Sequence, residues 1–216
     1  MSQGLVLIFG AGGHGKVVLD ILRNAAVEVA GFLDEDVRKE GATLGGLKIL
    51  GGWDYLDSHP GSTVALGIGN NRVRARLAAE LTGAGHLLTP AIHRRAIVCD
   101  DVLIGPGAVV MPGAVVNTGS TIETGCVVNT GATVDHDCRL AEFSQVWPGA
   151  HLAGAVTVGA GSYVGTGAAV IPNVTIGSNV MIGAGAAVVN DLPDDAVAVG
   201  VPARIIRMQT WRDREI

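Results

Sequence analysis

The sequence predicts two structural parts, an α/β half with a Rossmann-like parallel sheet followed by a parallel β-helix. In about the first 90 residues, continuous apolar runs alternate with stretches whose apolar residues have helical spacing. From Ile104 to Val188, a branched aliphatic residue recurs at every sixth position without an insertion. We expect the α/β half at residues 1–90, the β-helix at 91–198 and a C-terminal closing segment at 199–216.

The α/β half begins with a buried strand. Residues 5–9, LVLIF, form a continuous apolar run, as in a strand that is covered on both faces of a sheet. The pattern then predicts a helix over 16–25, a strand within 27–36, a strand over 63–69 and a helix over 70–85. Alternating strands and helices are typical of a parallel sheet with right-handed crossovers.

The second half repeats every six residues. The fifteen positions reached in steps of six from Ile104 to Val188 are all Ile, Val or Leu, and the residue two positions before each is small or β-branched. Three hexapeptides form one triangular coil, with the aliphatic side chain inside and small residues near the corners. Fifteen repeats give about five coils, and Ile92 and Val98 can add one before them. A Gly/Ala-rich linker does not explain aliphatic residues in such a register.

Composition narrows the class of function. The net charge of −5 offers no basic surface for nucleic acid. No run of 18 apolar residues occurs, and the N-terminus lacks the basic region of a signal peptide, so we expect a cytoplasmic protein without membrane insertion. The cysteines Cys99, Cys126 and Cys138 form no CxxC motif, which is typical of reduced thiols.

A glycine loop follows the first strand. The segment GAGGHGK, from Gly10 to Lys16, fits the pattern G-x-G-x-x-G before a helix, where backbone N–H groups can bind phosphate. Asp34 and Asp36 end the next strand, roughly where an acid that binds a ribose would lie. A nucleotide-sugar site, a nicotinamide site and a tight turn without a ligand all remain open. The nicotinamide is least favoured, because this half is short and no hydride-transfer domain follows.

The segment ATVDHDCRL, residues 132–140, contains the most polar triplet of the repeat region. His136 follows the inward-facing Val134 by two positions and therefore lies toward a corner of its coil. Gly154 is 18 residues further, so it should stack one coil away from His136. Imidazole suits a general base in acyl transfer, and a neighbouring carboxylate such as Asp137 can fix its tautomer. The alternative is a solvated corner histidine, and Asp135 stands at a position where polar residues are common.

The repeat, together with the segment VGVPARIIR at 199–207, resembles the left-handed β-helix of the hexapeptide-repeat acyltransferases. The order GAGGHG, LDED, GIGNNRVR and then hexapeptides is similar to one subfamily over nearly the whole chain. That subfamily contains sialic acid O-acetyltransferase-like proteins and nucleotide-aminosugar N-acetyltransferases of the bacillosamine and perosamine type. The resemblance implies a left-handed β-helix, a homotrimer and acetyl-CoA in a groove between neighbouring β-helices.

The resemblance also implies roles for individual residues. His136 would be the general base, with Asp137 as its partner and Glu142 in reserve, and the Gly154 N–H would contact the acetyl carbonyl. A second histidine of the bacillosamine pattern is replaced here by Gln145, which can still donate a hydrogen bond. The nucleotide sugar would contact Gly12, Gly13, His14, Asp34, Asp36, Gly69, Asn70 and Arg74. Acetyl-CoA would contact Gln145, Gly154, Thr166, Ala184, Pro202 and Arg204, and Arg207 could also meet its phosphates.

We expect a trimeric N-acetyltransferase that moves acetyl from acetyl-CoA to the amine of a nucleotide-linked 4-amino-4,6-dideoxysugar, such as GDP-perosamine or a UDP-aminosugar. Direct attack is expected, because Cys138 occupies a small-residue position and is interpreted as packing. By resemblance, the product would serve a surface glycan such as O-antigen. The alternatives are O-acetylation of sialic acid or another sugar hydroxyl, and a non-catalytic nucleotide-sugar-binding protein.

A metal enzyme of the γ-carbonic anhydrase kind is disfavoured. Such a site needs three converging histidines, whereas His136 and His151 are 15 residues apart instead of the 18 that would stack them. We therefore predict no metal site. The nucleotide base and the stereochemistry of the sugar are left open by the sequence.

Overall fold

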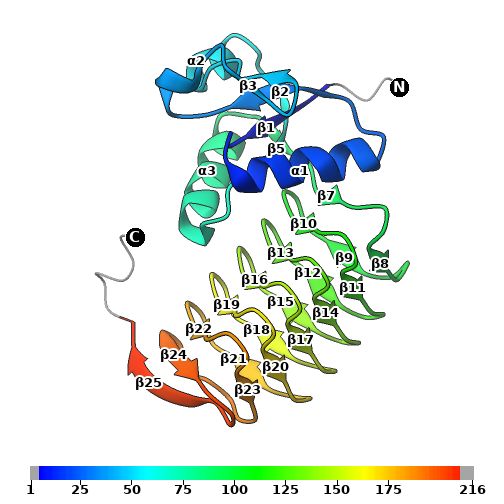
Figure 1. Ribbon diagram of the computed structural model, residues 1–216, viewed down its shortest axis with the longest axis vertical. Coiled ribbons are helices and arrows are strands. Elements are labelled where there is room, and N and C mark those ends of the chain that lie inside the picture. The colour runs from blue at the N-terminus through cyan, green and yellow to red at the C-terminus, as the bar shows by residue number, and fades with distance from the viewer. Residues whose placement is uncertain (1–4, 210–216) are drawn as a thin grey trace. The chain divides into compact units, whose positions relative to one another are not determined.

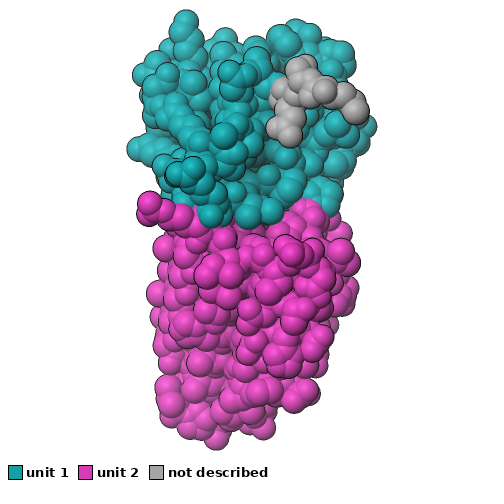
Figure 2. Space-filling view, turned by 90° about the vertical axis from the view of Figure 1, so that its right-hand side faces the viewer, with its two compact units in different colours: residues 1–94, 106–109 teal, residues 95–105, 110–216 magenta. Residues whose placement is uncertain are grey.

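The computed structural model describes residues 5–209 and divides the chain into two compact units. Unit 1 comprises residues 1–94 and 106–109, and unit 2 comprises residues 95–105 and 110–216 (Figure 2). Unit 1 is an α/β domain, and unit 2 consists of stacked coils of short strands (Figure 1).

A four-stranded parallel sheet forms the centre of unit 1, with the strand order β2-β1-β5-β6. β1 is buried along its whole length, as the apolar run predicts. The chain passes from β1 through α1 to β2, and later from β5 through α3 to β6, so the predicted alternation of strand and helix is confirmed. These elements are β1 (Val6–Phe9), α1 (Gly13–Asn24), β2 (Val29–Leu33), β5 (Thr63–Leu66), α3 (Asn71–Gly83) and β6 (Leu87–Leu88).

An apolar face holds α1 in the core, and a side-chain cap starts α3. α1 packs Val18, Leu19, Ile21 and Leu22 into the core, where each is at most 3% exposed. This spacing places the four side chains on one side of the helix. The N-terminus of α3 is capped by Asn70, whose side-chain oxygen accepts hydrogen bonds from the Arg72 and Val73 N–H groups.

The connection between β2 and β5 contains short elements that the sequence pattern did not predict. A small antiparallel hairpin is formed by β3 and β4, and one helical turn follows it. Elements this short bury too few periodic residues to leave a clear pattern. They are the 3-10 helix η1 (Val37–Lys39), β3 (Thr43–Leu44), β4 (Leu47–Lys48) and α2 (Trp53–Asp57).

Unit 2 is a parallel β-helix of about six turns. Its two-residue strands pair with a register of 18 residues, for example Val116 with Val134 and Val134 with Leu152. The three sheets have the orders β25-β24-β22-β19-β16-β13-β10-β7, β23-β20-β17-β14-β11-β8 and β21-β18-β15-β12-β9; β7 and the first residue of β10 belong to unit 1. The strands are β7 (Ala91–Ile92), β8 (Ile97–Val98), β9 (Leu103–Ile104), β10 (Val109–Val110), β11 (Val115–Val116), β12 (Thr121–Ile122), β13 (Val127–Val128), β14 (Thr133–Val134), β15 (Arg139–Leu140), β16 (Gln145–Val146), β17 (His151–Leu152), β18 (Thr157–Val158), β19 (Tyr163–Val164), β20 (Ala169–Val170), β21 (Thr175–Ile176), β22 (Met181–Ile182), β23 (Ala187–Val188), β24 (Ala196–Val199) and β25 (Arg204–Met208).

The predicted aliphatic positions form the core of the β-helix. All of them from Val110 to Val188 are buried, most of them completely. Ile104 is only half-buried, because β9 is the edge strand of its sheet. The small residues two positions earlier are buried as well from Ala108 onward, and they fit where the chain turns.

An antiparallel pair of β24 and β25 ends the described part of the β-helix. This pair contains part of the predicted closing segment, whereas residues 210–216 lie outside the described residues. Over residues 5–209, we find no helix with the length and apolar character needed to cross a membrane.

Candidate active site

The loops after β1 and β5 in unit 1 diverge at a topological switch point. From β1 the chain continues to β2 on one side, while β5 lies on the other side of β1. In open α/β sheets, ligands bind at such a point, outside the carboxyl ends of the strands. The predicted residues Gly12, Gly13 and His14 belong to the first loop and helix start, and Gly69 lies close to them: a Cβ on Gly69 would be 3.9 Å from the His14 Cβ.

Glycines allow these loops to approach closely. A Cβ on Gly10 would lie 2.6 Å from the Gly67 carbonyl oxygen, and a Cβ on Gly67 would lie 2.7 Å from the Gly10 oxygen. Gly12, the residue before α1, makes no side-chain cap. The first N–H groups of α1 therefore lack a side-chain acceptor of the kind that Asn70 provides at α3, and such groups suit a phosphate.

The two predicted aspartates have different surroundings. Asp34 accepts hydrogen bonds from the Ala11 N–H (2.9 Å) and from the Lys39 ammonium (2.7 Å), so it connects the end of β2 to the glycine loop. Partial burial opposes ionisation of Asp34, but these hydrogen bonds lower its pKa. Asp36 instead forms a two-point ion pair with Arg38 and caps η1.

Arg74 is fully buried and braces the loop after β5. Its guanidinium donates to the Ile68 and Gly69 carbonyls (both 3.1 Å) and to the Asn71 side-chain oxygen (2.6 Å). Burial, and then the charge of Arg74, lower the pKa of His14 to about 4, so its imidazole is neutral at physiological pH. The His14 Nε2 atom is buried and has no hydrogen-bond partner among residues 5–209.

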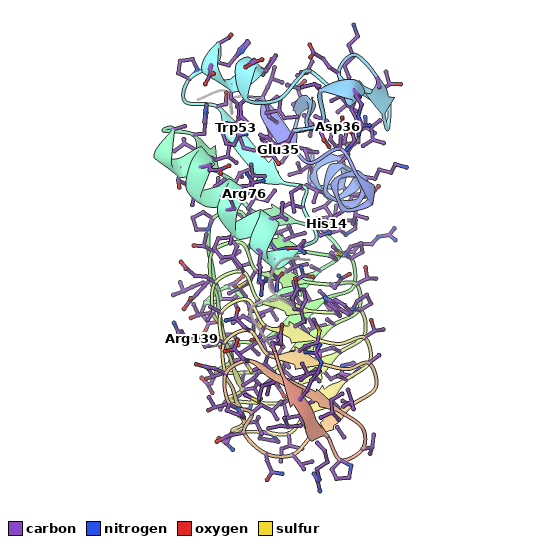
Figure 3. The ribbon with its side chains drawn as sticks, turned by 90° about the vertical axis from the view of Figure 1, so that its left-hand side faces the viewer. His14, Glu35, Asp36, Trp53, Arg76 and Arg139 are labelled. Carbon is purple, nitrogen blue, oxygen red and sulfur yellow. The ribbon has the colours of Figure 1, made fainter. Side chains whose placement is uncertain are left out.

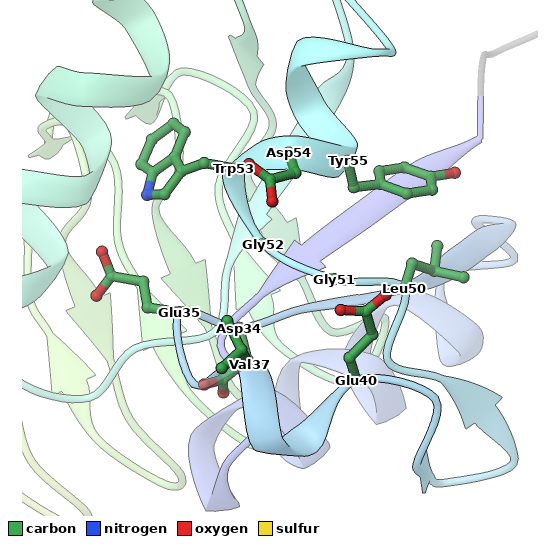
Figure 4. Close-up of a pocket in the computed structure, with 10 residues that line it drawn as sticks. All are labelled: Asp34, Glu35, Val37, Glu40, Leu50, Gly51, Gly52, Trp53, Asp54 and Tyr55. Carbon is green, nitrogen blue, oxygen red and sulfur yellow. The ribbon is translucent and has the colours of Figure 1, made fainter.

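A cavity of about 410 Å³ lies next to Asp34 (Figure 4). The segment from Asp34 to Glu40 lines one side and the segment from Leu50 to Tyr55 lines the other. Most of this lining was missed from the sequence, although the acidic run LDED and the aromatic pair in GGWDYLD were available signals. The cavity is lined by Asp34, Glu35, Val37, Glu40, Leu50, Gly51, Gly52, Trp53, Asp54 and Tyr55.

Glu35, at the edge of this cavity, is tied to α3. Its carboxylate pairs with Arg76 at 2.8 Å, and a hydrogen bond from Arg76, opposed by partial burial, lowers the Glu35 pKa. Glu35, Trp53 and Arg76 come from three different segments of unit 1 (Figure 3). Glu35 and Trp53 line the cavity, and the ion pair with Arg76 holds the Glu35 carboxylate in place.

In unit 2, the turn between β14 and β15 holds His136 and Asp137. The His136 Nδ1 atom lies 2.8 Å from the Asp137 Oδ2 atom, and both side chains are more than half exposed. This hydrogen bond, opposed by slight desolvation, raises the pKa of His136. Glu142 is exposed, and His136 pairs with Asp137 instead.

Gly154 stacks against the imidazole, as the 18-residue spacing predicts. A Cβ on Gly154 would lie 2.5 Å from the His136 Cε1 and Nε2 atoms, so only glycine leaves room for the ring. The backbone of the next residue, Ala155, donates a hydrogen bond to the His136 carbonyl (2.9 Å). The three residues predicted for catalysis therefore lie together.

Asp135 braces the turn from the other side. Its carboxylate accepts hydrogen bonds from the His136 N–H (2.8 Å) and from the Asn117 amide (2.9 Å), and its carbonyl accepts from the Ser120 hydroxyl. Asn117 and Ser120 belong to the preceding coil. Their role at this turn was not predicted from the sequence, although a step of 18 residues from Asp135 leads to Asn117.

Of the residues predicted for acetyl-CoA, Gly154 lies at the His136 corner of the coil, whereas Thr166 and Ala184 lie at another corner. Thr166 and Ala184 are exposed and stack in the turns that connect β19 to β20 and β22 to β23, whereas His136 lies between β14 and β15. Arg204 is exposed on β25, and Pro202 precedes it. Gln145 is buried in β16, and its side-chain oxygen accepts the Trp147 indole N–H (3.1 Å).

No cluster of three or more His, Cys, Asp or Glu side chains suited to a metal ion occurs within the described part of the chain. His151, the other histidine of the repeats, instead pairs with the Thr133 hydroxyl at 2.9 Å.

Comparison with known proteins places this chain among characterised acetyltransferases. Residues 5–81 match the family model of the PglD N-terminal domain. A curated relative, GDP-perosamine N-acetyltransferase of Escherichia coli O157:H7, is 28% identical over 176 residues, which cover 77% of this chain and 79% of that protein.

Two solved structures are similar over almost their full length. The acetyltransferase domain of PglB from Neisseria gonorrhoeae FA1090, in complex with acetyl coenzyme A, has 39% sequence identity and a TM-score of 0.87, with 93% of this chain and 98% of that chain covered. PerB from Caulobacter crescentus, in complex with CoA and GDP-perosamine, has 42% identity and a TM-score of 0.88, with 94% and 98% covered. The chain therefore belongs to the PglD-like hexapeptide acetyltransferases, which are acetyl-CoA-dependent N-acetyltransferases of nucleotide-linked aminosugars.

Proposed function

We propose that this protein transfers the acetyl group of acetyl-CoA to the amine of a GDP-linked 4-amino-4,6-dideoxysugar of the perosamine type. The observation that carries the proposal is the pairing of His136 with Asp137 against Gly154, one coil further. The similarity to a GDP-perosamine N-acetyltransferase and to PerB, whose structure holds GDP-perosamine, supports the choice of acceptor.

In the proposed reaction, the sugar amine attacks the thioester carbonyl directly. The His136 Nε2 atom takes the proton that the amine sheds, while Nδ1–H donates to Asp137, which stabilises the imidazolium. The Gly154 N–H offers a hydrogen bond to the developing oxyanion. As the tetrahedral intermediate collapses, the carbon–sulfur bond breaks, and the proton on His136 moves to the departing thiolate to give CoA and the acetamido sugar.

Unit 1 is proposed to hold the nucleotide. The N–H groups at the start of α1 suit the diphosphate, and Gly69, Asn70 and the neutral His14 lie at the same strand ends. Four carboxylates and no Lys or Arg side chain line the adjoining cavity. Such a lining favours a base that presents N–H donors, as guanine does with N1–H and N2–H₂, over the two carbonyls of uracil.

The positions of the predicted acetyl-CoA contacts support a site shared between copies of the chain. His136 and the stacked pair of Thr166 and Ala184 occupy different corners of the triangular coil. A trimer of β-helices can bring the His136 corner of one chain beside the Thr166 corner of its neighbour. We therefore propose a homotrimer, with acetyl-CoA between neighbouring β-helices and the arginines of β25, Arg204 and Arg207, near its phosphates.

We propose that the enzyme works in the cytoplasm. The free thiols of Cys99, Cys126 and Cys138 fit a reducing compartment. O-acetylation of sialic acid is the second candidate in the same subfamily, but an acid-lined nucleotide cavity has no role in a reaction with the free sugar.

The test is thiol release from acetyl-CoA with GDP-, UDP- and dTDP-linked aminosugars and with free sialic acid. We expect turnover with the GDP-linked 4-amino sugar and a loss of about 100-fold or more in His136→Ala. His151→Ala, which removes an exposed histidine of the same β-helix, is the control. Turnover with sialic acid alone would establish the O-acetyl alternative, and full activity in His136→Ala would rule out the assigned base.

A further inference from the structure

The carboxylate of Asp137 lies over a glycine of the preceding coil. A Cβ on Gly119 would lie 2.5 Å from the Asp137 Oδ1 atom and 3.4 Å from its Cγ atom. The other oxygen, Oδ2, is the one that pairs with the His136 Nδ1 atom at 2.8 Å. The carboxylate can therefore reach the imidazole in this orientation only because position 119 has no side chain.

The backbone holds this stack of turns together. The Asp137 N–H donates to the Thr118 carbonyl (3.0 Å), so the two turns are in direct register. One coil earlier, Asp101 accepts hydrogen bonds from the Thr118 hydroxyl (2.7 Å) and from the Gly119 N–H (2.9 Å). A shift of the turn therefore could not relieve the clash between a side chain at position 119 and Asp137 without breaking these hydrogen bonds.

We propose that Gly119 is a positioning residue, whose missing side chain places the Asp137 carboxylate against His136. This inference rests on the proposed function, since it assumes that Asp137 supports the catalytic base. Together with Gly154, which leaves room for the imidazole ring itself, Gly119 places the pair between two glycines, one in the preceding coil and one in the following coil.

A backbone requirement is the competing explanation for this glycine. Gly119 has φ +72°, a conformation that alanine adopts with strain. Gly113 provides a matched control, because it has φ +71° in a turn of the same β-helix and an added Cβ there would meet nothing nearer than 3.9 Å. The Gly113→Ala variant thus measures the backbone effect without the contact to Asp137.

The test reads the environment of His136 directly. The imidazole of His136 is titrated by NMR in histidine-labelled protein, and the His136→Gln variant assigns its signal. The titration is done in the wild type and in four variants, Gly119→Ala, Gly113→Ala, Asp137→Asn and Gly119→Ala/Asp137→Asn. The charged groups in the turn that holds His136 are Asp135 and Asp137. The stacked turns at 117–120 and 153–156 contain no titratable side chain, and Asp101 lies one coil beyond. Circular dichroism and sedimentation verify that each variant is folded and assembled.

We expect the pKa of His136 to fall in Gly119→Ala and in Asp137→Asn, because the imidazolium loses its carboxylate partner. The turnover number should fall about tenfold or more in both, and the acidic limb of the pH–rate profile should move to lower pH. In Gly113→Ala both readouts should match the wild type, and in the double variant Gly119→Ala should add nothing to Asp137→Asn.

Three results would overturn the inference. If Asp137→Asn lowers the His136 pKa and Gly119→Ala does not, Gly119 has no positioning role. An equal fall in Gly113→Ala would assign the effect to the backbone. If Asp137→Asn itself changes neither readout, the proposed role of Asp137 fails, and the inference about Gly119 fails with it.

Discussion

His14 shows how burial decides what a single residue can do. The sequence places it in a glycine loop, where a charged histidine would be an obvious partner for a diphosphate. In the folded chain, burial and the charge of Arg74 lower its pKa to about 4. The neutral ring can instead offer a hydrogen bond from its buried Nε2 atom, while the backbone N–H groups of α1 remain available for the anion.

The low pKa of His14 predicts a pH dependence of stability. Between pH 6.5 and about 4, the unfolded chain binds a proton at His14 that the folded chain does not, so the folded state loses stability as the pH falls through this range. Relative to His14→Gln, the wild type should lose about 1–3 kcal/mol over this range. Urea unfolding of the ligand-free protein measures it. The exposed His59→Gln is the control, and parallel curves for wild type and His14→Gln would contradict the prediction.

Arg74 and Arg76 provide a second comparison at the residue scale. Both lie on α3. Arg74 is fully buried and donates hydrogen bonds to backbone carbonyls, whereas Arg76 forms ion pairs and is about half exposed. Arg74→Ala should destabilise unit 1 by about 2–4 kcal/mol, because it removes the hydrogen bonds of a fully buried side chain and leaves a cavity in its place. Arg76→Ala should cost about 1 kcal/mol or less. Chemical unfolding followed by a unit 1 probe such as Trp53 fluorescence distinguishes them, and equal losses would mean that the buried contacts of Arg74 contribute little.

At the scale of elements, most two-residue strands of the β-helix contribute one side chain to the core and one to the surface, whereas both residues are buried in β10, β13 and β16. Such strands are too short to be stable alone, so their stability comes from the stacking of identical positions in successive coils. The core residue of β12 is Ile122, which is fully buried, and its neighbour Thr121 faces outward. Both belong to the same strand and face opposite sides of it.

This alternation predicts unequal effects of alanine within one strand. Ile122→Ala should destabilise unit 2 by about 2–4 kcal/mol, because it leaves a cavity in a stack that cannot collapse easily. Thr121→Ala should change stability by about 0.5 kcal/mol or less. Thermal unfolding of the two variants compares them. A loss in Thr121→Ala as large as in Ile122→Ala would show that the outer face of β12 is packed against something in solution.

At the scale of the whole molecule, the assignment of acetyl-CoA contacts depends on assembly. Within one chain, His136 and Ala184 occupy different corners of the coil. A shared site therefore predicts complementation between two inactive chains. We expect His136→Ala and Ala184→Trp to be inactive separately. Co-expression should restore activity at about a quarter of the sites, because in randomly mixed trimers about a quarter of the interfaces pair an intact His136 corner with an intact Ala184 corner.

Native mass spectrometry verifies that mixed assemblies form at three times the 22.0 kDa chain mass. The double variant in one chain is the negative control. If mixed trimers form but activity is not recovered, the two corners do not act together across an interface, and the shared site is contradicted.

The sequence by itself determined the two-part fold and the position of the proposed base, His136. The hexapeptide period is a property of residue type along the chain, so it fixes which side chains face inward and that His136 and Gly154 stack. What only the tertiary structure decided are contacts between residues without a fixed spacing. Examples are the burial of His14 beside the charge of Arg74, which keeps its imidazole neutral, and the cavity between Asp34 and Tyr55. Gly119 and Asp137 share the 18-residue spacing, but that spacing does not show that the carboxylate of Asp137 lies over position 119 and pairs with His136. These depend on burial and on side-chain direction, which only the packed backbone defines.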